Sequence, residues 1–205
     1  MVPAPEPIPD DAAVRARLAA SRVAIIGAGG LGSNIASMLL RSGVLEMTII
    51  DFDRIEESNL NRQLFFRDQL GDLKVEALAV TLRRIDPRVS LTLIPEVLTA
   101  ENFEQLLGRP DVIVEAVDGA ETKALIINEW SKRLSDIPLV AASGLAGCAS
   151  ANCIVTEQLA ENCWLIGDHT ADVRLGHPLM SSRVTVAAAH QAHAVVRLLL
   201  GLSPA

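Results

Sequence analysis

Apolar positions in the first part of the chain form short continuous runs and helical spacings in turn. Residues 23–27 (VAIIG) are an apolar run that ends in glycine, which is typical of a buried parallel strand. Apolar side chains then recur at helical spacing from Leu31 to Leu39, and Gly43 stands where a helix can end in a left-handed residue. A second apolar run, 47–51 (MTIID), follows. This order predicts a βαβ unit.

The same alternation continues to about residue 142. One helix face runs from Val75 to Ile85, where Asp86-Pro87 stops the helix. The remaining apolar patterns predict strands at 89–94, 112–117 and 139–142, with helices at 100–107 and 121–134 between them. Regular strand–helix alternation predicts an α/β fold, a Rossmann-like, doubly wound, mostly parallel sheet with helices on both faces.

The pattern differs at the two ends of the chain. Two strand-like runs, 151–156 (ANCIVT) and 162–167 (NCWLIG), follow each other without a helix between them, which predicts an antiparallel extension of the sheet. A last helix is expected at 182–200. We expect residues 1–20 to form a flexible, proline-rich lead-in and a short helix, and residues 21–205 to form a single domain.

Composition narrows the class of protein. The 205 residues are 50% hydrophobic, which favours a packed core over disorder. With 18 Lys and Arg against 25 Asp and Glu, the net charge of −7 argues against nucleic acid and against an anionic membrane surface as partners. The N-terminus lacks a basic and then apolar leader, no apolar run is long enough for a membrane span, and three closely spaced cysteines favour a reducing compartment. We therefore expect a cytoplasmic protein.

Residues 27–32 (GAGGLG) fit the pattern G-x-G-x-x-G between a predicted strand and a predicted helix. In this pattern Gly27 permits the tight turn, Gly29 lets a phosphate approach the backbone, and Gly32 lets the helix and strand pack closely. The helix N-terminus can hold an anion, and the Asp51 carboxylate at the end of the next strand can accept hydrogen bonds from a ribose. The motif predicts nucleotide binding without identifying the nucleotide.

A polar segment follows Asp51. It carries polar groups and two well-spaced cations: Asp53, Ser58, Asn59, Asn61, Arg62, Gln63 and Lys74. One interpretation is a solvated loop whose charges face water. However, the polar run 58–63 (SNLNRQ) is followed directly by Leu-Phe-Phe, which indicates a polar loop held by apolar anchors.

These motifs resemble a known family. The chain has GAGGLGS, D-F-D, S-N-L-N-R-Q and G-x-x-K in this order, as in the ThiF/MoeB/ubiquitin-activating-enzyme superfamily. The resemblance extends through 113–123, 143–147 and 188–201, and it is strongest to the short ThiF branch, the ThiS adenylyltransferases of thiamine (thiazole) biosynthesis. It implies ATP-dependent adenylylation of the C-terminal glycine of a ubiquitin-fold sulfur carrier protein with a Gly-Gly tail. It also implies a homodimer.

The resemblance assigns roles to individual residues. ATP would lie over the glycine loop with its ribose on Asp51, and Arg62 and Lys74 would act on the phosphates as catalytic cations. Asp118 would position Mg²⁺, although a cap for the helix near residue 120 is the alternative role. The full set expected to bind the nucleotide is Gly27, Gly29, Gly30, Leu31, Gly32, Asp51, Asp53, Asn59, Arg62, Gln63 and Lys74.

The reaction implied by the resemblance needs no general base, because a terminal carboxyl with a pKa of about 3.5 is already ionised at neutral pH. Longer relatives hold a structural zinc with four cysteines, whereas this chain has three, so we expect no such zinc. Cys163 lies near the reactive cysteine of some relatives, but a buried, unreactive cysteine is the commoner case. Two alternatives remain open: an NAD-dependent oxidoreductase, which rests on the glycine motif alone, and a non-catalytic, nucleotide-dependent module that docks the carrier.

Overall fold

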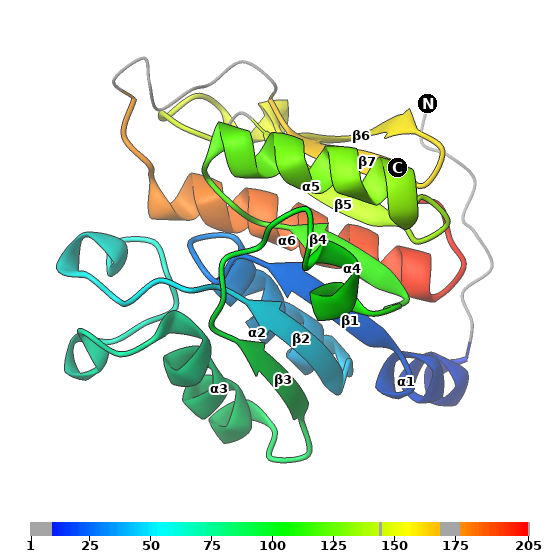
Figure 1. The fold of residues 1–205 in the computed structure, drawn as a ribbon, viewed down its shortest axis with the longest axis horizontal. Helices are drawn as coiled ribbons and strands as arrows, with labels where there is room; N and C mark the ends of the chain where they lie inside the picture. Colours follow the sequence, from blue (N-terminus) through cyan, green and yellow to red (C-terminus); the bar gives the residue numbers. More distant parts are fainter. Residues whose placement is uncertain (1–9, 144, 169–176, 205) are drawn as a thin grey trace.

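The computed structural model describes residues 10–143, 145–168 and 177–204, and within them one seven-stranded sheet organises the chain (Figure 1). The strand order is β3-β2-β1-β4-β5-β7-β6, and every neighbouring pair is parallel except β6 and β7. The strands are β1 (Arg22–Ile26), β2 (Glu46–Ile50), β3 (Ser90–Ile94), β4 (Val112–Glu115), β5 (Leu139–Ser143), β6 (Val155–Ala160) and β7 (Cys163–Gly167). The predicted fold class, including the antiparallel extension, is confirmed.

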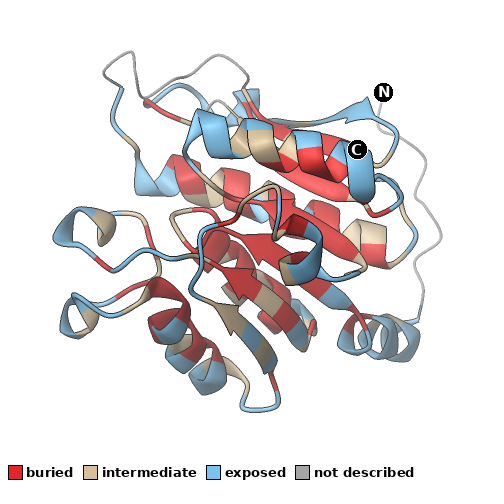
Figure 2. Cartoon of the chain, viewed as in Figure 1, coloured by how far each residue is buried: buried red, intermediate tan, exposed pale blue. Residues whose placement is uncertain are grey.

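Helices cover both faces of the sheet. One face carries α1 (Asp11–Ala19), α2 (Gly32–Ser42), α3 (Lys74–Ile85) and α6 (Ser181–Leu199), and the other carries α4 (Phe103–Leu107) and α5 (Ala120–Arg133). Alternate residues of one strand supply the two cores, because successive side chains of a strand point to opposite faces. On β1, Val23 and Ile25 join the core with α2 and α6, whereas Ala24 and Ile26 join the core with α5. Figure 2 shows the central strands buried and the edge strand β6 largely exposed.

The helix ends follow the chain's own capping residues. Asp10 caps α1 by accepting hydrogen bonds from the backbone N–H groups of Ala12 and Ala13. Gly43 ends α2 with a left-handed backbone at φ 110°, as its position predicts. Among the helices that the structure describes, none is long and apolar enough to cross a membrane.

Two predicted elements begin later than expected. The helix expected from residue 100 starts at Phe103, because the Asn102 side chain accepts a hydrogen bond from the Thr99 N–H and holds a turn there. The strand expected from residue 151 starts at Val155, because residues 151–153 form a short 3₁₀ turn capped by Ser150. The proline-rich lead-in lies outside the described residues, apart from the Asp10 cap.

Candidate functional site

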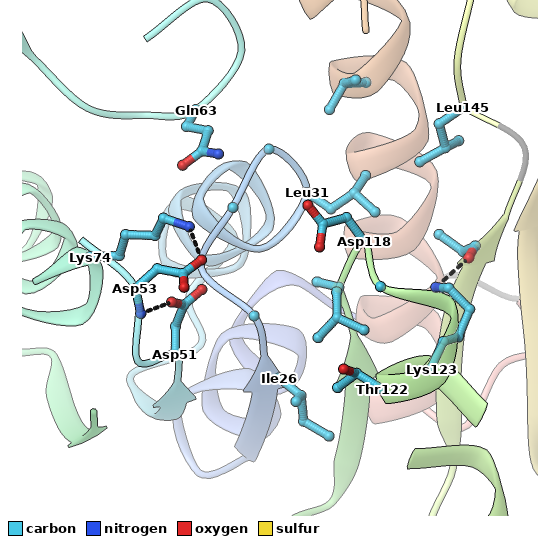
Figure 3. Close-up of a pocket in the computed structure, with 18 of the residues that line it drawn as sticks. Ile26, Leu31, Asp51, Asp53, Gln63, Lys74, Asp118, Thr122, Lys123 and Leu145 are labelled. Carbon is cyan, nitrogen blue, oxygen red and sulfur yellow. Dashed lines mark hydrogen bonds and ion pairs between the residues drawn. The ribbon is translucent and has the colours of Figure 1, made fainter. Parts of the chain in front are cut away.

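A cavity of about 760 Å³ lies where the carboxyl ends of β1, β2, β4 and β5 meet. In an open parallel sheet this edge is where ligands bind. Most of the predicted site residues line the cavity: Gly27, Gly29, Gly30, Leu31, Asp51, Asp53, Arg62, Gln63, Lys74 and Asp118. Gly32 and Asn59 are not among the lining residues. Figure 3 shows Asp51, Asp53 and Lys74 on one side of the glycine loop and Asp118 on the other.

The glycine loop is built by close backbone contacts. Gly27 has a φ of +99°, and a Cβ added there would lie 2.7 Å from the carbonyl oxygen of Ala116. A Cβ on Gly32 would lie 1.8 Å from the carbonyl oxygen of Gly27, so both positions require glycine. At Gly29 the nearest such atom is 3.7 Å away, on the Gln63 side chain, which leaves room for a ligand against the backbone. Gly32 therefore shapes the loop from outside the cavity.

Asp51 connects the end of β2 to the glycine loop. Its carboxylate accepts a hydrogen bond from the Ala28 N–H at 2.6 Å and another from the Asp53 N–H at 2.8 Å. Burial raises the pKa of Asp51, while the Ala28 N–H and the charge of Lys74 oppose that shift. Each carboxylate oxygen has a second lone pair, so the side chain can still accept a hydroxyl hydrogen bond.

Lys74 brings a positive charge to the cavity from the start of α3. Its side chain is 7% exposed, and its Nζ lies 2.6 Å from Oδ2 of Asp53, which is 49% exposed. The Lys74 N–H also donates to the Asp53 carbonyl oxygen at 2.9 Å. The backbone N–H and the side-chain ammonium group of Lys74 are thus both bonded to Asp53, in the loop after β2. The ammonium group is therefore held at the cavity wall.

Three other residues predicted to bind the nucleotide are arranged less directly. Arg62 lines the cavity, but its guanidinium donates to the Asn61 side chain at 2.8 Å in an exposed loop. Asn59 accepts a hydrogen bond from the Glu56 N–H through its side-chain oxygen and caps a short 3₁₀ turn. Gln63 is 9% exposed, and its amide oxygen has no partner among the described residues. Nucleotide contacts by these three residues remain predictions.

Asp118 lies in the turn between β4 and α5 and faces the glycine loop across the cavity (Figure 3). Gly119 is the N-cap residue of α5, and no side chain caps this helix, so the alternative role of Asp118 as a cap is wrong. No group of three or more His, Cys, Asp or Glu side chains in the described residues could hold a metal ion. A single carboxylate suits Mg²⁺ when phosphate oxygens and water complete the coordination.

The sequence did not identify a buried acid and lysine behind Asp118. Glu115 is 0% exposed and forms an ion pair with Lys123, whose Nζ also donates to the Ala142 carbonyl oxygen at 2.7 Å. Burial raises the pKa of Glu115, while the charge and the hydrogen bond of Lys123 oppose the shift. The available signal was an acidic residue inside an apolar strand, since such a residue needs a buried partner.

The cysteines occupy different environments. Cys163 lies on β7, is 5% exposed and packs in the core beside α5. Burial raises the pKa of the Cys163 thiol, which disfavours the reactive thiolate. Cys148 and Cys153 are exposed. The structure thus supports the buried, unreactive interpretation of Cys163.

The sequence matches the profile of the ThiF family over residues 6–205. The tRNA threonylcarbamoyladenosine dehydratase of Haemophilus influenzae is 33% identical over 131 residues, which are 63% of this chain and 50% of that protein. Ubiquitin-like modifier-activating enzyme 5 of Drosophila grimshawi is 38% identical over 122 residues, which are 54% of this chain and 31% of that enzyme. The chain thus spans half or less of these relatives' length.

Two solved structures share the fold. Escherichia coli tRNA N6-threonylcarbamoyladenosine dehydratase, in complex with ATP, superposes with a TM-score of 0.84 at 22% identity. The superposed residues are 92% of this chain and 89% of that chain. Escherichia coli MccB with ATP superposes with a TM-score of 0.69 at 24% identity. The superposed residues are 91% of this chain and 58% of the MccB chain. At these identities the likeness shows the fold alone.

Proposed function

Because this chain belongs to the ThiF family, we propose that it uses ATP and Mg²⁺ to adenylylate the C-terminal glycine carboxylate of a ThiS-like, ubiquitin-fold sulfur carrier protein. The products are an acyl-adenylate and pyrophosphate, and the reaction serves thiamine (thiazole) biosynthesis. One observation carries the proposal: a single cavity joins the glycine loop, Asp51, the buried Lys74 and Asp118. In this proposal residues 21–205 are the catalytic domain of a cytoplasmic homodimer.

The cavity suits a nucleoside triphosphate. The open space beside Gly29 accommodates phosphate oxygens next to the backbone at the start of α2, where the helix dipole favours an anion. Asp51, fixed by two backbone N–H groups, accepts hydrogen bonds from the ribose. Lys74 and Arg62 both line this cavity, and in this proposal they contact the phosphates.

The reaction forms a bond between a carboxylate oxygen of the carrier and the α-phosphorus of ATP. The bond from the α-phosphorus to the bridging oxygen breaks, and pyrophosphate leaves with the electron pair. No proton moves in this step, so the residues act by position and charge. Lys74 and Arg62 offset the repulsion between the anionic carboxylate and the triphosphate. Mg²⁺ held by Asp118 and the phosphates would neutralise charge on the pyrophosphate.

The relatives' names agree with this chemistry. Enzymes that activate ubiquitin-like modifiers and an adenylyltransferase and sulfurtransferase of Bos taurus are among the proteins similar to this chain. The chemical test incubates the protein with ATP, Mg²⁺ and a ThiS-like carrier, and detects the carrier adenylate by intact mass spectrometry. A carrier without its terminal glycine is the control. ATP binding with no adenylate on several Gly-Gly carriers would instead support the docking module.

A second candidate is ATP-dependent dehydration of threonylcarbamoyladenosine in tRNA. The observation that favours it is the 33% identity, over 131 residues, to the tRNA threonylcarbamoyladenosine dehydratase of Haemophilus influenzae. The net charge of −7 opposes it, because tRNA is a polyanion. Incubation with ATP and tRNA that carries this nucleoside, followed by nucleoside mass spectrometry, separates the two. Loss of water from the nucleoside would favour the tRNA substrate.

A further inference from the structure

A fully buried carboxylate lies directly behind the turn that presents Asp118. Glu115 ends β4 with 0% of its side chain exposed, and a buried charge of this kind needs a partner and hydrogen bonds. All of its contacts go to segments that border the cavity. The buried Glu115 charge is therefore connected to the wall of the candidate site.

The Glu115 carboxylate contacts the chain on both sides of Asp118. Its Oε1 accepts a hydrogen bond from the Val117 N–H at 2.9 Å, immediately before Asp118. Its Oε2 accepts from Nζ of Lys123, which lies in the first turn of α5 beyond Asp118. These bonds also explain why β4 stops at Glu115 and not at Val117 as predicted: the Val117 N–H pairs with a side chain and not with a neighbouring strand.

Two further elements fix the same acid and lysine. Nζ of Lys123 donates to the carbonyl oxygen of Ala142 on β5 at 2.7 Å. From α6, Nε2 of the buried Gln191 donates to the Glu115 carbonyl oxygen at 3.0 Å and to that of Val140 at 3.3 Å. The ends of β4 and β5, the start of α5 and the middle of α6 are thus joined in one network. Figure 3 shows Asp118 and Lys123 on the two sides of the turn between β4 and α5.

We propose that Glu115 and Lys123 are positioning residues that set the Asp118 carboxylate for the Mg²⁺ carried by the ATP phosphates. This inference rests on the proposed function. Asp118 lines the cavity from the β4–α5 turn, and the bonds of Glu115 hold the chain before and after it. Groups outside the direct metal ligands can orient a ligand and strengthen metal binding, and here the pair would act through the backbone of the turn.

Variants can separate position from stability. Lys123→Met keeps the apolar stem but leaves the Glu115 charge buried and unpaired, which destabilises the fold. The double variant Glu115→Gln, Lys123→Met removes both charges and keeps an oxygen for the Val117 N–H, so it provides a folded test. The matched control is Lys132→Met on the same helix, because Lys132 pairs with Glu129 and does not line the cavity.

The measurement is ATP binding by calorimetry, with and without Mg²⁺, which needs no carrier. We expect the gain in ATP affinity on adding Mg²⁺ to shrink by roughly 10–100-fold in the double variant, as for loss of other outer partners of a metal ligand. Affinity for ATP without Mg²⁺ should change little, and the Lys132→Met control should keep the full gain. An unchanged Mg²⁺ gain in the folded double variant would overturn the positioning role.

A cycle with Asp118→Asn excludes a merely structural effect. If Glu115 and Lys123 act through Asp118, the double variant loses little further Mg²⁺ gain when Asp118 is already replaced. Equal losses in both backgrounds would overturn the inference, because the pair would then act independently of Asp118. If the unmodified protein binds no ATP or shows no Mg²⁺ gain, the proposed function falls as well. If it shows both and the variants keep them, only the positioning role falls.

Discussion

Replacing Lys74 by methionine separates the charge at the cavity from the packing that holds it. The Lys74 side chain is 7% exposed, and methionine fills most of the same volume. The lost partner, Asp53, is 49% exposed and can be solvated, so we expect the free energy of unfolding to fall by only about 1 kcal/mol. In the proposed reaction, in contrast, the ammonium group at the cavity wall contacts the triphosphate. Loss of one preorganised contact to developing charge costs about 100- to 1000-fold in rate, or about 2.7–4 kcal/mol.

The assay is carrier-dependent ATP–pyrophosphate exchange, with urea unfolding measured on the same preparations. The matched control is Arg83→Met, which removes an exposed cation near the other end of α3 and changes the net charge equally. We expect Arg83→Met to keep nearly full exchange and Lys74→Met to lose it while remaining folded. Near-normal exchange in folded Lys74→Met would refute the role of Lys74 at the phosphates.

Three further predictions concern the loop, the thiols and the buried acid. Gly32→Ala should lower the free energy of unfolding by about 3 kcal/mol or more in urea titrations, because its Cβ would lie 1.8 Å from the Gly27 carbonyl oxygen; a change within experimental error would contradict the close approach. Alkylation followed by mass spectrometry should label the exposed cysteines of the folded protein well before Cys163, and equal rates would argue against its burial. Burial already raises the pKa of Glu115, and Lys123→Met removes the cation that opposes this. When an acid has a higher pKa in the folded state than in the unfolded state, the folded state is favoured while the acid is protonated, and this advantage is lost as pH rises through the folded-state pKa. The stability deficit of Lys123→Met should therefore be larger at about pH 8 than at about pH 5. A deficit independent of pH would contradict this.

Local patterns were sufficient for most of the architecture. Buried parallel strands are apolar on both faces, so runs such as residues 23–27 stand out against the helical spacing that follows them. The glycine positions were also informative, because Gly27 and Gly32 have backbone neighbours that exclude any side chain. The errors came from side chains that bind nearby backbone, as at Asn102, which delays α4.

The network behind Asp118 could not be predicted in the same way. Glu115 and Lys123 are eight residues apart, but their other partners, Ala142 and Gln191, lie further along the chain and reach them only when the sheet and α6 assemble. Their spacing follows no local period. Polar residues with distant partners therefore appear in the sequence only as exceptions to an apolar pattern.

In the proposed function, this cavity activates the C-terminal carboxylate of a carrier with ATP. The decisive measurement is Mg²⁺-dependent ATP–pyrophosphate exchange with an intact ThiS-like carrier and with the same carrier lacking its terminal glycine. We expect exchange only with the intact Gly-Gly tail. Exchange that ignores the tail, or none with any carrier despite ATP binding, would contradict it.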